Sequence, residues 1–465
     1  MSRSTIPNPA QVSRRRFLRA GGFAVGGLGL ADLMRLRATA GTGVTALDTA
    51  VILLWLPGGP PHMETYDLKP DAPVEYRGKF RPIPTVVPGL DVCEHMPLHA
   101  KLADKFTIVR SVAHEFADHG GGHKRFLTGR APAEPTGFIN DAPMVGSIVA
   151  KMREGRDHGV PNYVAGADPN RGGVDVFSFG AAYLGPSYTP FTVVGNPGAA
   201  DFRVEGLSIS PELTDRLGDR TRLLHGFDRL RRDLDRSGAL DAMDAFDRRA
   251  LSLMVSEKAR LAFDLSREDP RLRDRYGRHS WGQRALLSRR LVEAGCDFVT
   301  MVLENPVPAG QAFPPGVIYN WDSHAVNGHI FDDAEFRLPL YDQAVTALVE
   351  DLYHRGLDRR VLLIVTGEFG RTPRLSYEKG RPGRDHWPGA MSMLLSGGGM
   401  RTGQVVGATD ARGEAPKERP LTPNDLWATV YHHLGIDPEH SFLDGRGRPL
   451  SILPFGAPIR ELLPA

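Results

Sequence analysis

The residues best suited to chemistry follow the apolar run Val361–Thr366, which is typical of a strand buried on both faces. Ligands of open α/β sheets bind beyond the carboxyl ends of such strands. The candidate side chains that come after this run are Glu368, Arg371, Arg384, Asp385 and His386. An acid, cations and an Asp-His pair together suit the binding of a metal ion, a charged ester, or both.

A second group of candidates surrounds the glycine triplet at 120–122. His114, His119 and His123 lie within ten positions of one another. His119 and His123 are four residues apart, so on a helix they would share one face. A helix that begins at the triplet would also favour an anion at its N-terminus. A single histidine is usually structural, but three beside a glycine turn indicate a functional site.

Two further loops carry candidates. Asp322 and His324 are two residues apart, so in extended backbone their side chains point the same way, which suits metal ligation. His62, Glu64 and Asp67 follow a glycine-proline loop after the apolar run at 51–56, and two interpretations stay open for them. They are either site residues or turn residues on a solvated loop.

The elements that must position these side chains alternate along the chain. Continuous apolar runs predict strands, and apolar residues at helical spacing predict helices. The predicted strands are 51–56, 106–109, 191–194, 298–303, 361–366 and 391–395, and the predicted helices are 143–152, 280–294, 336 to about 356, and 425–434. Such alternation predicts a single α/β domain at 48–465, with a helical insertion at about 211–295.

The N-terminus has the features of an export signal. Residues 13–19 (SRRRFLR) match the twin-arginine motif, a weakly apolar segment follows at 20–33, and Ala38-Thr39-Ala40 suits cleavage. The apolar segment is too short and glycine-rich for a stable transmembrane span. We therefore expect residues 1–40 to be a leader that engages the twin-arginine translocase, and the protein to reach the periplasm.

Composition limits the alternatives. A net charge of +2 gives no electrostatic case for binding nucleic acid. Cys93 and Cys296 are the two cysteines of the chain. They could pair outside the cytoplasm, but they form no disulfide framework and have no zinc-site spacing.

Several motifs together resemble a known family. They are the GGP loop at Gly58, WDSH at Trp321, EFGRTP at Glu368, GRDHWP at Gly383 and GATD at Gly407. With the leader, they resemble the exported proteins of domain of unknown function 1501 over nearly the whole mature chain. That family is similar in architecture to alkaline phosphatases and sulfatases, which are α/β sandwiches that hold metal at strand ends and hydrolyse phosphate or sulfate esters.

The resemblance also implies a changed site. Gly58-Gly59 stands where sulfatases carry two metal-binding aspartates, and Glu368-Phe369 replaces a later Asp-His or Asp-Asn pair. Counting back from the LTGR sequence at 127–130 places His119 where sulfatases carry their modified cysteine. The chain therefore has no formylglycine, and Pro61 replaces a serine common in its own family.

We therefore expect an alkaline phosphatase/sulfatase-like three-layer α/β sandwich with a central, mostly parallel sheet and a rebuilt metal site. The expected metal ligands are His119, His123, Asp322, His324, Glu368, Asp385 and His386, and the expected catalytic residues are His119, Arg371 and Arg384. Either arginine would hold an anionic group. The ion would be divalent, such as zinc, manganese or iron.

Two functions remain open at this point. One is metal-dependent hydrolysis of an anionic small-molecule or glycan ester, of the phosphate or sulfate type. His119 would then either ligate the metal or attack the ester covalently. The other is non-catalytic binding of an anionic glycan or a partner protein on an enzyme-like scaffold, because fold does not fix function.

Overall fold

The computed structural model describes residues 48–156, 158–168, 177–204, 207, 256–308 and 311–464. Residues Ala46–Ala465 form one compact unit. The predicted leader at 1–40 and residues 211–255 of the predicted helical insertion lie outside the described residues. No helix in the described part of the chain is long and apolar enough to cross a membrane.

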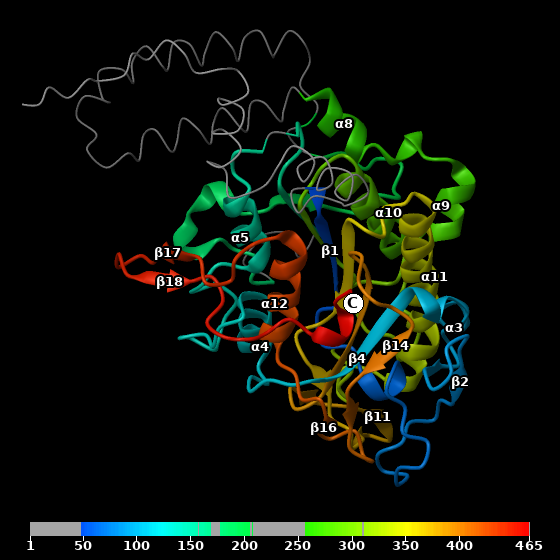
Figure 1. Ribbon diagram of the computed structural model, residues 1–465. Coiled ribbons are helices and arrows are strands. Elements are labelled where there is room, and N and C mark those ends of the chain that lie inside the picture. The colour runs from blue at the N-terminus through cyan, green and yellow to red at the C-terminus, as the bar shows by residue number, and fades with distance from the viewer. Residues whose placement is uncertain are drawn as a thin grey trace, which may run out of the picture. The chain divides into compact units, whose positions relative to one another are not determined.

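A central sheet organises this unit (Figure 1). It has eight strands in the order β14-β4-β13-β8-β1-β7-β5-β6. Their bounds, in that order, are Gln404–Val406, Phe106–Val112, Met391–Gly397, Val361–Thr366, Ala50–Trp55, Phe298–Val302, Tyr163–Ala167 and Phe191–Val194. The central strands are buried at every residue, which is why their sequences read as unbroken apolar runs.

The sheet is parallel except around one strand. β13 runs antiparallel to both of its neighbours, β4 and β8, whereas the other pairs in the sheet are parallel. The carboxyl ends of β4, β8, β1 and β7 therefore meet at one edge. Because β13 is reversed, the loop that enters it starts from this same edge. The predicted mostly parallel sheet is confirmed.

Helices cover both faces of the sheet, which confirms the predicted three layers. On β1, Ile52 and Leu54 belong to one apolar core and Val51, Leu53 and Trp55 to the other. The first core includes residues of α3, α8, α10 and α11, and the second includes residues of α4, α5 and α12. The bounds are Pro97–Leu102 (α3), His119–Thr128 (α4), Val145–Met152 (α5), Glu257–Phe263 (α8), Pro270–Tyr276 (α9), Ser280–Glu293 (α10), Ile330–His354 (α11) and Pro423–Leu434 (α12).

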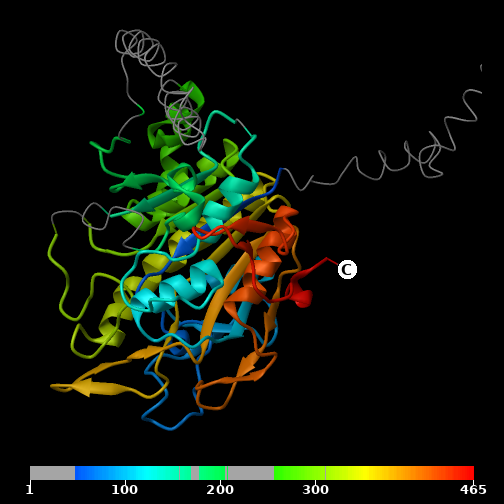
Figure 2. The same ribbon diagram turned by 90° about the vertical axis from the view of Figure 1, so that its left-hand side faces the viewer.

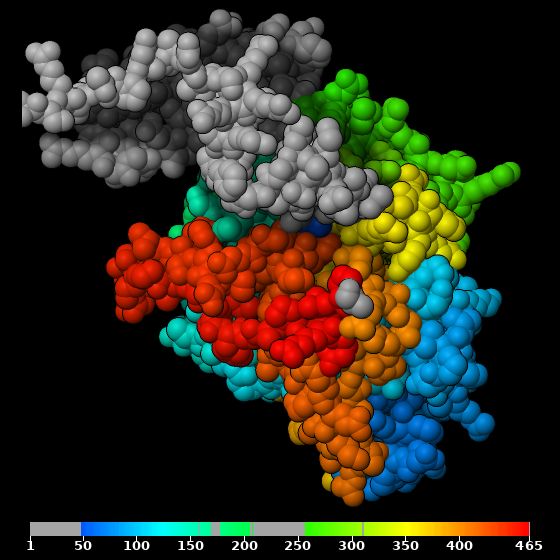
Figure 3. Space-filling model, in the orientation of Figure 1, coloured from blue at the N-terminus to red at the C-terminus, as the bar shows by residue number. Residues whose placement is uncertain are grey.

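Small antiparallel ladders lie outside the main sheet. They pair β2 with β3, β9 with β12, β10 with β11, β15 with β16 and β17 with β18. Their bounds are Pro82–Pro84, Asp91–Cys93, Gly370–Arg371, His386–Trp387, Ser376–Glu378, Arg381–Gly383, Ala408–Thr409, Pro416–Glu418, Ser441–Leu443 and Pro449–Ser451. The β10–β11 hairpin projects at the lower left of Figure 2. Segments from the C-terminal part of the chain, orange to red, lie over the face seen in Figure 3.

The two cysteines do not pair. Cys93 and Cys296 are both buried and free. Burial raises the pKa of the Cys93 thiol to about 12, so this thiol is unreactive.

Candidate metal centre

Three strands of the main sheet and the short strand β12 deliver polar side chains to the common edge of the sheet. His119 begins α4 after β4, Asp322 lies in the loop after β7, and Glu368 follows β8. His386 arrives through the short β12, which pairs with β9 so that His386 lies opposite Arg371. Side chains that are far apart in sequence therefore meet because their strands end at one edge.

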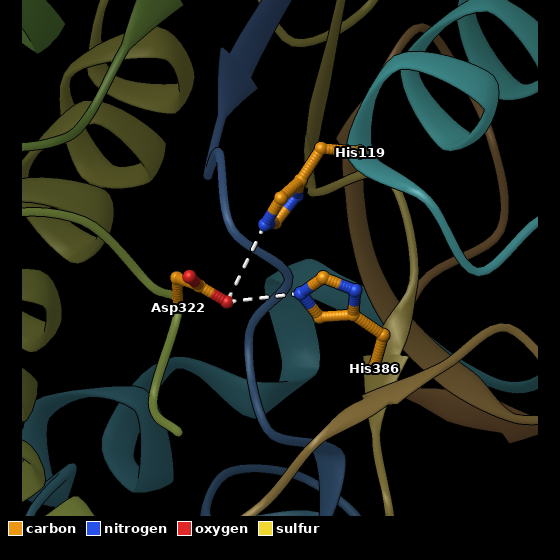
Figure 4. Close-up of side chains that lie close together, drawn as sticks. All are labelled: His119, Asp322 and His386. Carbon is orange, nitrogen blue, oxygen red and sulfur yellow. Dashed lines mark hydrogen bonds and ion pairs between the residues drawn. The ribbon is translucent and has the colours of Figure 1, made fainter. Parts of the chain in front are cut away.

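Three imidazoles surround one carboxylate oxygen at this edge. Asp322 Oδ1 lies 3.0 Å from His386 Nε2, 3.1 Å from His324 Nε2 and 3.4 Å from His119 Nε2. Figure 4 shows His119 and His386 pointing at Asp322 from a helix and a strand on the same side. Each of these four side chains keeps about a fifth to a quarter of its surface exposed, at 18–27%. The cluster is therefore open to solvent on one side.

The outer nitrogen of each imidazole is held by an oxygen. The Nδ1 atoms lie 2.8 Å from Glu368 Oε1 for His119, 2.6 Å from Asp385 Oδ1 for His324, and 2.7 Å from the Ala117 carbonyl for His386. Because these oxygens only accept, each Nδ1 must carry the proton. In the neutral ring the Nε2 atom then presents a lone pair to the cluster. This is the arrangement in which metal-binding histidines are usually oriented.

The charges around Asp322 shift the ionisation of the cluster. Burial alone would raise the pKa of Asp322, but hydrogen bonds from the three imidazoles and the charge of Arg371 hold that pKa far below its usual range. Burial alone would lower the pKa of His119, but its bonds to Asp322 and Glu368 raise it to about 9. The bond to Asp322 likewise raises the pKa of His324. Without a metal, these raised pKa values favour the protonated imidazoles of His119 and His324, whose positive charge faces the Asp322 carboxylate.

Glu368 and His123 form a more deeply buried extension of the cluster. Glu368 Oε1 accepts the Gly58 N–H at 2.8 Å and lies 3.6 Å from His123 Nε2. His119, His123 and Glu368 are also close enough together to hold an ion, as are His119, Asp322 and His386. The shared His119 cannot serve both groups through one nitrogen. Since its Nδ1 already donates to Glu368, its Nε2 and the Asp322 group form the more accessible site.

Arg371 lies beside the cluster, but its N–H groups are bonded within the protein and are not available to bind a ligand. Its side chain is fully buried, and it donates to Asp322 Oδ1 at 2.5 Å and to the carbonyls of Gly58, Gly59 and Arg384. A cation in this place favours the ionised form of Asp322 and fixes its carboxylate. The guanidinium thus fixes the Asp322 carboxylate, and its N–H groups are already used by Asp322 and the three carbonyls instead of being offered to an anion.

The side chain of Arg384, which was expected to hold an anionic group, is bonded to Glu64 and not to the cluster. Its side chain and that of Glu64 are both fully buried and bonded to each other, with Nη2 2.8 Å from Glu64 Oε1. The remaining bonds of its guanidinium go to the carbonyls of Tyr76, Thr372 and Pro373. Every nitrogen of this side chain is therefore engaged. Arg384 and Glu64 tie the loop after β1 to the loop before β13.

The residues that orient the imidazoles differ from those nearest in sequence. Asp118 caps α4 by accepting the Gly120 and Gly121 N–H groups, and Glu115 pairs with Arg125. Neither orients His119, a role that falls to Glu368 instead. Sequence spacing indicated neither this contact nor the packing of Phe369, whose ring lies 5.3 Å from that of His119 and 4.7 Å from that of His386.

The mostly parallel sheet, its helical layers and the polar cluster at its carboxyl edge define an α/β protein with a candidate metal centre at its strand ends. The chain belongs to the family described as "Protein of unknown function (DUF1501)", whose model matches residues 48–463. The family resemblance seen in the sequence is therefore confirmed. No curated protein matches the sequence.

Solved structures of similar fold include three named enzymes. A sulfatase from Pseudoalteromonas sp. is 13% identical, with 93% of this chain and 72% of that chain covered and a TM-score of 0.36. The phosphonate monoester hydrolase of Agrobacterium radiobacter is 12% identical, with 89% and 76% covered and a TM-score of 0.35. The lipoteichoic acid synthase from Listeria monocytogenes is 9% identical, with 92% and 81% covered and a TM-score of 0.36. At these values no activity transfers to this chain.

Proposed function

We propose that this protein is an exported, divalent-metal-dependent hydrolase of phosphate or sulfate esters, acting through His119, Asp322, His324 and His386. The observation that carries the proposal is the convergence of three imidazole Nε2 atoms on Asp322 Oδ1 while each Nδ1 is held by an oxygen. Three nitrogens and one carboxylate suit zinc, manganese or iron.

The exposure of the cluster favours catalysis over a purely structural ion. Structural zinc sites are closed by protein ligands, whereas catalytic sites leave one position for water or substrate. Here every member of the cluster is partly exposed, at 18–27%. A divalent ion bound there would lower the pKa of a water molecule and polarise the ester.

The roles of the chain's own residues follow from their contacts. His119, His324 and His386 would bind the ion through Nε2, with Glu368, Asp385 and the Ala117 carbonyl fixing their rings. Arg371 would keep Asp322 ionised. The side chains that contact Asp322 Oδ1 are three imidazoles and the Arg371 guanidinium, which supports water as the nucleophile and His119 as a ligand.

A second candidate function has one observation in its favour. Arg371 and Arg384 are both buried and bonded internally, so neither is available to hold an anionic ester group. A protein with the same metal centre but no turnover would hold an anionic glycan or a partner protein through the ion alone, without positioning an ester for attack, and would need neither arginine at the surface.

Reconstitution distinguishes the two functions. We expect chelator-stripped protein to hydrolyse 4-nitrophenyl phosphate or 4-nitrophenyl sulfate only after zinc, manganese or iron(II) is restored. Asp322→Asn should abolish this activity, whereas the exposed Asp104→Asn should retain it. Stoichiometric metal binding without hydrolysis of either ester would instead support the binding protein. Failure to bind any of the three ions would refute both forms of the metal-centre proposal.

A further inference from the structure

An open pocket of ≈ 390 Å³ lies next to the candidate metal centre. Its volume falls within the range of about 300–1,000 Å³ that is usual for small-molecule sites. The described residues that line it are Phe313, Val317, Ile318, Tyr319, Asn320 and Asn327. No charged side chain is among them, so the wall of this pocket is uncharged, whereas the neighbouring cluster consists of ionisable side chains.

Two residues belong to the wall of the pocket and also contact Asp322. Asn320 Oδ1 accepts the Asp322 backbone N–H at 3.1 Å. Asn327 Nδ2 donates to the Asp322 carbonyl at 3.0 Å and to Asp322 Oδ2 at 3.1 Å. The pocket and the metal centre are therefore separated by single side chains. A substrate with its ester at the metal centre could therefore extend into this pocket.

These same bonds determine what the two amides can offer. Because Asn320 uses its oxygen on Asp322, its amide N–H groups are left as donors. Because Asn327 uses its nitrogen, its amide oxygen is left as an acceptor. A donor and an acceptor side by side match hydroxyl groups, each of which both donates and accepts.

The other walls are apolar and aromatic. Phe313 is 40% exposed, and its ring centroid lies 6.3 Å from that of Tyr319, with the planes inclined by 34°. Val317 and Ile318 complete this side. Such a surface suits a ring with an apolar face, while a charged group would lose its hydration here without a partner.

We infer that this pocket, formed by Phe313, Val317, Ile318, Tyr319, Asn320 and Asn327, is a subsite for an uncharged sugar ring of the substrate. A sugar ring combines an apolar face with hydroxyl groups at its edge, as the walls require. The inference rests on the proposed function in taking the cluster around Asp322 as the place where the ester reacts, and it narrows the substrate to an ester of a glycan.

Binding of uncharged probes tests the subsite without requiring metal or turnover. Saturation-transfer NMR on the full chain would compare methyl glycosides of glucose, galactose and fucose with adenosine and 4-nitrophenol. We expect at least one methyl glycoside to bind in the millimolar range, with Phe313→Ala weakening it by about tenfold through loss of the stacking face. Phe455→Ala removes an aromatic side chain that is 55% exposed elsewhere on the protein and should leave binding unchanged.

The outcomes separate this inference from the proposed function. If no glycoside binds, or if only adenosine or 4-nitrophenol binds, the sugar subsite is refuted even if the protein holds metal. If Phe313→Ala and Phe455→Ala bind a glycoside as wild type does, the sugar lies elsewhere and the assignment is also refuted. Metal content measured on the same samples reports on the metal centre alone. Val317→Trp, which fills the pocket, provides a second variant and should abolish glycoside binding at unchanged metal content.

Discussion

The Nε2 atoms of His324 and His386 lie 2.9 Å apart, although the Nδ1 atom of each ring already faces an oxygen acceptor. Two neutral rings held in this way would point lone pairs at each other and at Asp322. Such an arrangement is stable only with positive charge between them, either as protons or as a metal ion. This contact therefore predicts that protons and a metal ion compete for the same Nε2 atoms. It supports the metal centre more strongly than the residue types alone do.

Glu368 should control metal affinity without being required for the fold. Its Oε1 accepts from His119 Nδ1 and from the Gly58 N–H. Glu368→Gln keeps an oxygen at this place but removes the charge that polarises His119, so we expect metal binding to weaken by about 10–100-fold. Competition with a chromophoric chelator measures this, with the exposed Glu335→Gln as control. Equal affinities for the two variants would show that Glu368 does not act through His119.

The cluster should make metal binding depend on pH. The pKa of His119 is raised to about 9 from 6.5, so its proton stabilises the metal-free protein fully below 6.5, and this contribution is lost as pH rises through about 9. Because the ion must displace that proton, metal affinity should rise over the same range.

Two measurements check this dependence on the same material. Metal titration at several pH values gives the affinity. Denaturant unfolding of metal-free wild type and His119→Ala gives the free-energy difference due to His119, which should shrink between pH 6.5 and about 9. A metal affinity that is flat across this range would contradict the proton–metal competition.

Glu64 and Arg384 should matter for stability. Both side chains are fully buried in one ion pair. Replacing Arg384 with Met leaves the Glu64 charge buried without its partner, which we expect to cost about 3–5 kcal/mol in the free energy of unfolding. The double variant Glu64→Met/Arg384→Met should lose much less than the sum of the single variants. Denaturant unfolding measures all three, and additive losses would mean that the pair is not energetically coupled.

Export remains a prediction from sequence, because residues 1–40 lie outside the described residues. Changing Arg14 and Arg15 together to Lys keeps the charge but removes the twin-arginine motif. We expect unprocessed protein to accumulate in the cytoplasm, as cell fractionation would detect. If the double variant is processed and exported like wild type, the twin-arginine route is wrong.

Much of the fold could be read from the sequence because the central strands are continuous apolar runs. β1, β7, β8 and β13 were predicted to within a few residues. β5 (YVAGA) was missed, since its alanines and glycine carry little strand preference. The helix α11 begins at Ile330, before its predicted start at Phe336, because His329 caps it and acidic residues occupy its first turn.

The candidate site was predictable in part. Strand ends indicated His119, Asp322, His324 and His386, which the structure brings together. The partners of these residues were not predictable. The Ala117 carbonyl is a backbone group without a sequence signal, and the Glu64–Arg384 pair joins residues 320 positions apart. The positions of residues after predicted strands indicate which side chains lie at the sheet edge. Only the tertiary contacts show which of the charged side chains are paired within the protein, as Arg371 is with Asp322 and Arg384 with Glu64.

The metal content of protein purified from its native compartment tests the central claim most directly. After removal of loosely bound ions, elemental analysis should find about one divalent ion per chain in wild type and in Asp104→Asn. Asp322→Asn and His119→Ala should lose the ion, together with the stabilisation that a ligand bound only to the folded state provides. Full occupancy of His119→Ala would exclude His119 as a ligand and favour a covalent role. Wild-type protein with less than about a tenth of an ion per chain would contradict the metal centre itself.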